Sequence, residues 1–154
     1  MINSYAIMLN ENRVPYLHLE QAIDYKKENE FNSAERIVEL INVCFDLSNC
    51  AEERLITVAM DAKCHVIGIF KTSHGALNTT EANPRNILFR ALLCGACTFA
   101  VCHNHPSGDC TASADDLTVA HRIKEAGDLL GIPMCDFIII GNGTFLSFCD
   151  TNCL

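Results

Sequence analysis

The pattern of apolar and polar positions predicts two β-hairpins in the central and C-terminal parts of the chain. Apolar and β-branched residues fill positions 55–61 and 65–72, and the residues between them suit a turn joining antiparallel strands. Strand-like runs at 136–140 and 144–148 flank a Gly-Asn-Gly sequence, which favours a tight turn. Each pair of runs is therefore expected to form adjacent antiparallel strands.

Helical spacing of apolar residues appears before the first of these hairpins and between the two. Ser33 offers a cap for a helix with apolar residues on one face, and Pro84 suits the first turn of a helix that Gly95 ends. Ser113 caps a third helix, which ends near Gly131. A short apolar run at 98–102 predicts a strand between the second and third helices. The order hairpin, helix, strand, helix, hairpin predicts an α/β protein with a mixed β-sheet flanked by helices.

The first 30 residues predict an extension that precedes this domain. Strand-like runs at 5–9 and 14–19 flank polar residues that suit a turn, and charge at helical spacing over 19–30 predicts a helix after them. With 154 residues, 49% of them hydrophobic, the chain can form one packed core. We therefore expect a hairpin and helical extension at 1–30 and one domain at 31–154.

Composition and charge narrow the function. The chain has 11 Lys and Arg residues against 19 Asp and Glu, a net charge of -8, and the basic residues are scattered. Because nucleic-acid-binding proteins usually concentrate positive charge, direct nucleic-acid binding is not expected. The sequence shows no export signal or membrane-spanning apolar run, which predicts a cytoplasmic protein. Its ten cysteines lie mostly in apolar segments, which favours buried, reduced thiols.

The candidate chemistry lies in the sequence HNHPSGDCTASADD at 103–116. His103 and His105 are two apart at the end of an apolar strand, so their side chains are expected on one face. Asp116 lies in the first turn of the next helix, from which its carboxylate can turn back toward the strand end. The three residues predict a site for one Zn2+ ion. The alternative is a polar strand end and an acidic helix start, but the combined motif is rarer than its parts.

Three protein ligands leave one tetrahedral position for water, as in catalytic zinc sites. Zinc lowers the pKa of such a water to about 7. A nearby carboxylate is then needed to move the proton, and periodicity does not identify which Glu does this.

The motif resembles the JAMM signature, which is His-x-His, seven residues beginning with Pro, and then Ser-x-x-Asp. The run HNHPSGD resembles the RadC-like branch in particular, and the resemblance extends over about 31–149. It implies the JAB/MPN fold, a cytidine-deaminase-like α/β/α arrangement, with zinc held by both histidines and Asp116. It also implies a metallopeptidase or isopeptidase whose substrate is a peptide or protein, including one linked to a ubiquitin-like tail.

The same resemblance implies roles for two further residues. A glutamate that orients the water maps by position to Glu53, with the adjacent Glu52 as its competitor. Ser113 corresponds to a serine whose hydroxyl holds the oxyanion of the tetrahedral intermediate, so capping and catalysis both stay open for it. The chain departs from the family pattern at Asn86, where Glu is usual, and at Phe137, where His is usual. Neither change removes a predicted ligand.

Other functions fit the motif less well. A zinc deaminase needs His-x-Glu followed by Pro-Cys-x-x-Cys, whereas Cys94 and Cys97 precede the histidines, and packing in the core explains them better. The complete ligand set opposes a non-catalytic binding module. A DNA-repair role is associated with RadC-like proteins that carry an N-terminal helix-hairpin-helix segment, and residues 1–50 lack its pattern.

Overall fold

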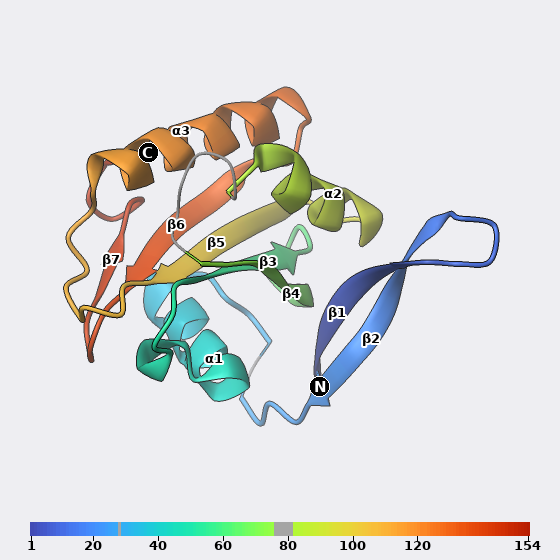
Figure 1. The fold of residues 1–154 in the computed structure, drawn as a ribbon, viewed down its shortest axis with the longest axis horizontal. Helices are drawn as coiled ribbons and strands as arrows, with labels where there is room; N and C mark the ends of the chain where they lie inside the picture. Colours follow the sequence, from blue (N-terminus) through green and yellow to red (C-terminus); the bar gives the residue numbers. More distant parts are fainter. Residues whose placement is uncertain (28, 76–81) are drawn as a thin grey trace.

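The strands form one mixed sheet in the order β2-β1-β4-β3-β5-β6-β7, with helices packed on both of its faces (Figure 1). A computed structural model describes residues 1–27, 29–75 and 82–154. The strands are β1 (Ile2–Leu9), β2 (Pro15–Ile23), β3 (Arg54–Met60), β4 (Val66–His74), β5 (Thr98–Asn104), β6 (Met134–Ile140) and β7 (Phe145–Ser147). The helices are α1 (Ala34–Phe45), α2 (Pro84–Leu93) and α3 (Ala114–Leu129), and a 3-10 turn, η1 (Leu47–Asn49), follows α1.

The two predicted hairpins and the mixed α/β architecture are confirmed. β3 pairs antiparallel with β4, and β6 pairs antiparallel with β7. Between these hairpins, β5 runs antiparallel to β3 and parallel to β6. Since parallel neighbours need a crossover, α3 makes the connection from β5 to β6, which brings its N-terminus back toward the end of β5.

Alternation along the strands sorts side chains between the two faces of the sheet. Phe99 and Val101 of β5 join the core beneath α2 and α3, whereas Ala100 and Cys102 join the core beneath α1. His103 continues the first set and therefore points to the side of the sheet that α3 covers. The alternation of β5 thus directs a buried histidine toward the start of α3.

The N-terminal hairpin is confirmed, but the helix predicted over 19–30 is wrong. Residues 19–23 belong to β2, which pairs with β1 as far as Ile23 opposite Ile2, and residues 24–27 and 29–30 are not helical. Pairing with β1 satisfies the backbone in an extended form, and Tyr25 and Phe31 pack their rings 5.7 Å apart in the core. Tertiary contacts therefore override the helical spacing of the charges.

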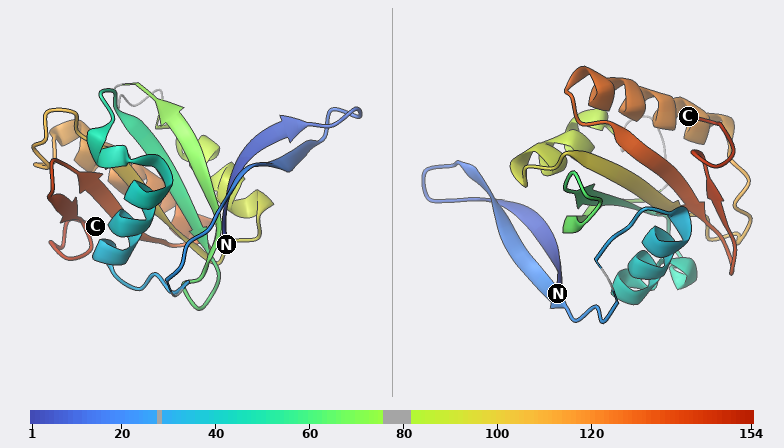
Figure 2. Two further views of the ribbon diagram at one scale, coloured as in Figure 1. Left: turned by 90° about the horizontal axis from the view of Figure 1, so that it is seen from below. Right: turned by 180° about the vertical axis from the view of Figure 1, so that it is seen from behind.

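The hairpin formed by β1 and β2 projects from the body of the protein (Figures 1 and 2). Large apolar side chains are exposed along its outer part, namely Met8, Leu9, Val14, Tyr16 and Leu19.

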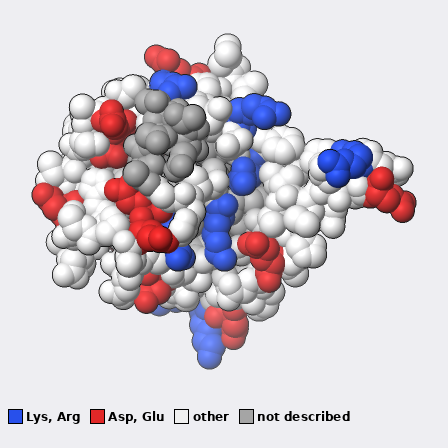
Figure 3. Space-filling model, in the orientation of Figure 1, with Lys and Arg blue, Asp and Glu red and all other residues white. Residues whose placement is uncertain are grey.

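Basic side chains do not merge into one continuous patch on the face drawn in Figure 3. No helix among the described residues is both long and apolar enough to cross a bilayer.

The expectation for the cysteines is only half right. All ten are free thiols, but Cys102 alone is buried, and Cys97, Cys135 and Cys149 are exposed. An apolar neighbourhood in sequence does not fix burial, because alternate positions of a strand point away from the core. Cys94 packs partly against the core as expected, whereas the expectation that Cys97 does so is wrong.

Candidate metal centre

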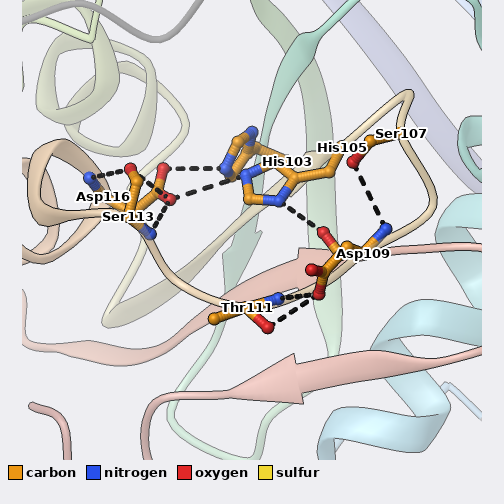
Figure 4. A network of polar contacts seen from close by, with 7 residues as sticks. All are labelled: His103, His105, Ser107, Asp109, Thr111, Ser113 and Asp116. Atoms are coloured by element: carbon orange, nitrogen blue, oxygen red, sulfur yellow. Dashed lines mark hydrogen bonds and ion pairs between the residues drawn. The ribbon is translucent and has the colours of Figure 1, made fainter.

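The candidate metal ligands meet where β5 ends and α3 begins. His103 lies near the end of β5, His105 directly follows this strand, and Asp116 is the third residue of α3. His103 and Asp116 are almost fully buried, at 0% and 2% exposure, and His105 is partly buried. The three side chains point toward one another (Figure 4).

The distances between these side chains fit a metal ion. Asp116 Oδ1 lies 3.0 Å from His103 Nε2, and Asp116 Oδ2 lies 3.5 Å from His105 Nε2. One ligand atom from each residue lies within 4.8 Å of the other two, and no other such group of three occurs among the described residues. Ligand atoms on tetrahedral zinc, with bonds of about 2.0–2.1 Å, are about 3.3 Å apart. The two histidines and Asp116 can therefore hold a metal ion.

A hydrogen bond to the backbone orients His105 for this role. Its Nδ1 lies 2.7 Å from the carbonyl oxygen of Asp109 and must donate to it, which leaves Nε2, 3.5 Å from Asp116 Oδ2, as the nitrogen that can bind a metal. The side chain of Asp109 in turn accepts from the backbone N–H of Thr111 at 2.9 Å and from its hydroxyl at 2.7 Å. The loop after β5 thus holds His105 in a ligating orientation (Figure 4).

Ser113 and Asp116 form a reciprocal cap at the start of α3. The Ser113 backbone N–H and hydroxyl each donate to Asp116 Oδ2 at 2.7 Å, and the Ser113 hydroxyl accepts from the Asp116 N–H at 3.1 Å. Burial raises the pKa of Asp116, but hydrogen bonds from His103 and Ser113 outweigh it and hold this pKa well below its usual range. The capping role of Ser113 is confirmed, and its oxyanion role stays a prediction.

Glu53 and Glu52 lie in different surroundings, although they are adjacent. Glu53 lines a cavity of about 530 Å³ together with His103, His105 and Asp116. Glu52 does not line that cavity, and its carboxylate lies 2.5 Å from His74 Nε2 in an exposed ion pair. Of the two glutamates, Glu53 is the one that shares a cavity with the metal ligands.

Asn104 is a site residue that the sequence did not reveal. Its side chain is buried, accepts from the Arg54 N–H at 2.8 Å and donates to the carbonyls of Cys50 and Glu52 at 3.2 Å. These bonds fasten the segment that carries Glu53 to the strand that carries the histidines. Its position between the two histidines could have revealed it. Because strand side chains alternate, the Asn104 amide must point to the face of the sheet opposite the histidines.

One nitrogen of His103 lacks a polar partner. His103 Nδ1 is buried and has no hydrogen bond with any described residue, while the ring of Phe137 lies 6.0 Å away, centroid to centroid. Ligating histidines usually donate their second N–H to an acceptor. Phe137 stands where the family pattern usually has His, so an apolar ring packs against the His103 ring here.

The fold and this geometry define an α/β protein with a candidate metal centre of two histidines and one aspartate. Residues 31–153 match the RadC-like JAB domain. A UPF0758 protein of Pelobacter propionicus is 36% identical over 110 residues, which cover 71% of this chain and 48% of the relative. A UPF0758 protein of Clostridium kluyveri is 36% identical over 123 residues, covering 80% of this chain and 54% of the relative. The chain belongs to the RadC-like JAB domain family, and it spans about half the length of these relatives.

Proposed function

We propose that this protein is a JAMM-type zinc hydrolase that cleaves an amide bond in a peptide or protein. The observation that carries this proposal is the meeting of His103, His105, Asp116 and Glu53 around one cavity. Two imidazoles and a carboxylate form a ligand set that zinc favours, and three protein ligands leave a position open, as catalytic zinc sites do.

Each residue has a distinct part in this proposal. His103, His105 and Asp116 hold the ion, which when bound supplies Lewis-acid polarisation of the substrate carbonyl and acidifies the attacking water. The Glu53 carboxylate takes a proton from that water and returns it to the leaving nitrogen. The Ser113 hydroxyl donates to Asp116, so it would have to exchange this bond to donate to a substrate oxyanion.

The proposed substrate is a peptide or protein, including one joined through a lysine isopeptide bond to a ubiquitin-like tail. The residues beside the ligands, Pro106, Ser107 and Ser113, are exposed, so the cavity is accessible from the surface. The excess of acidic over basic residues disfavours nucleic acid as the substrate. We further propose that residues 1–30 form an extension to a domain at 31–154, which the family match over 31–153 supports.

The test is a cleavage assay on the full chain, stripped with a chelator and reloaded with zinc. The probes are a fluorogenic peptide library of mixed sequence and a matched library with isopeptide-linked lysine. We expect turnover in at least one library, lost on chelation and restored by zinc. A zinc-loaded protein that turns over neither library would contradict the proposal.

The pair Glu53→Gln and Glu52→Gln then separates chemistry from metal binding. Since general-base catalysis contributes about 100- to 10,000-fold, Glu53→Gln should lower kcat by that factor while zinc content stays unchanged. Glu52→Gln is the matched control and should keep nearly full activity, because Glu52 pairs with His74 outside the cavity. Full activity in Glu53→Gln would remove this residue from the mechanism.

A further inference from the structure

A second cavity, of about 310 Å³, lies between the start of β3 and the end of β4, and the described residues that line it carry basic or hydroxyl side chains. Its lining residues are Arg54, Lys71, Thr72, Ser73 and His74. Leu55 pairs with His103 and lies in the core beneath α2 and α3, so alternation turns the Arg54 side chain to the opposite face of the sheet from the candidate metal centre. The two cavities are therefore separate sites.

The two full cations of this cavity have no acidic partner among the described residues. Arg54 Nε is buried without a hydrogen-bond partner, and its guanidinium forms no ion pair with any described residue. Lys71 Nζ lies 5.3 Å above the ring of Phe45, and it too has no ion pair among the described residues. A buried polar nitrogen normally has a hydrogen-bond partner, and Arg54 Nε has none among the described residues, whereas Lys71 is exposed. An oxyanion in the cavity would accept from Arg54 and compensate the charge of both side chains.

A β-bulge brings hydroxyl groups to the same place. Leu55 pairs with Ser73 and Ile56 pairs with Lys71, so Thr72 is an extra residue in β4. The Glu52 carboxylate, near this end of the strands, is engaged by His74 Nε2 at 2.5 Å. Arg54 and Lys71 thus remain available for a ligand, with hydroxyl donors beside them.

We propose that this cavity binds a small oxyanion, either a phosphate group or a carboxylate. A guanidinium offers several N–H donors in a fixed fork that matches both groups, and an ammonium and hydroxyls add further donors. Binding would give Arg54 Nε the acceptor that no described residue provides. This inference does not depend on the proposed hydrolase activity.

The test is a nuclear magnetic resonance titration of the zinc-loaded full chain with sodium phosphate and, separately, with sodium acetate. Sodium chloride holds the ionic strength constant. We expect saturable shifts of the amide signals of Arg54 and residues 71–74 with at least one of the two anions. The anion that binds more tightly shows whether the cavity prefers a phosphate group or a carboxylate. Shifts at these residues that chloride alone reproduces, or no saturable shift, would overturn the proposal.

Variants locate the binding group and control for folding. Arg54→Gln should weaken anion binding by about tenfold or more, and Arg54→Lys should weaken it less, because it keeps the charge but loses the fork. Arg122→Gln, which changes an exposed residue on α3, should bind as the unchanged protein does. Equal affinity in Arg54→Gln and the unchanged protein would also overturn the proposal. Zinc content should stay the same in all three variants.

Discussion

The two sides of the candidate metal centre are built differently. On the ligand side, His103 and Asp116 are buried and bonded to each other, and the loop at Asp109 orients His105. On the opposite side, Glu53 is only partly buried, and its segment is fastened to β5 through Asn104. The hydrogen bonds that join the ligand side chains lie within 103–116, whereas the segment of Glu53 is held by hydrogen bonds between residues about 50 apart in the chain. Changes on the two sides should therefore have different effects.

The largest effect is expected from Asp116→Asn. Loss of a second-sphere partner costs about 10- to 100-fold in metal affinity, and loss of a ligand should cost more than about 100-fold. Competition with a chromophoric chelator measures this affinity. Asp115→Asn is the matched control, because Asp115 is an exposed neighbour in the same cavity, and it should change zinc affinity little. Similar affinities in the two variants would exclude Asp116 as a ligand.

Asn104→Ala should damage the Glu53 side and spare the ligands. It leaves one backbone N–H and two carbonyls without their partner, so we expect a loss of at least about 2 kcal/mol in unfolding free energy. Denaturant unfolding measures this loss. Because Glu53 shifts relative to the ligands, kcat should fall more than KM rises, while zinc content is retained. If zinc is lost and the remaining zinc-loaded protein keeps its kcat, Asn104 serves the ligand side instead.

Gly141→Ala should disturb the loop that orients His105. An added Cβ would lie 2.3 Å from the carbonyl oxygen of Gly108, next to Asp109, so the loop must move. We expect about 1–3 kcal/mol of destabilisation, with zinc binding weakened about tenfold. Gly127→Ala is the control: its Cβ would lie 2.6 Å from the Ile132 carbonyl, away from the ligands. It should destabilise the protein in thermal unfolding without changing zinc affinity, and equal effects of both variants on zinc would refute this role of the loop.

Phe137→His should have the smallest effect, and in the favourable direction. An imidazole beside His103 can offer an acceptor to the buried Nδ1, which has no partner among the described residues. We expect zinc affinity to rise by up to about tenfold in the chelator competition. Phe137→Leu, which removes the ring without adding an acceptor, should not raise it. An equal increase in both variants would mean that the Phe137 ring itself hinders binding.

The difference between the two sides also explains what the sequence could predict. The spacing of His103, His105 and Asp116, together with a helix cap at Ser113, predicted a metal site that the geometry supports, because a strand end and a helix start fix these positions locally. Glu53 could be identified only through a family resemblance, and Asn104 was not identified at all. Both depend on strand pairing, which decides what lies opposite residues 50–54. The prediction of a helix over 19–30 was wrong for the same reason, because pairing with β1 makes residues 19–23 extended.

The zinc content of the purified chain, reloaded and dialysed, tests the central claim most directly. Mass spectrometry of the metal should find about one zinc ion per chain, removed by a chelator and restored on reloading. His103→Ala, prepared in parallel, should hold almost none. A chain that retains no zinc after reloading, or a His103→Ala variant that retains as much as the unchanged protein, would contradict the account.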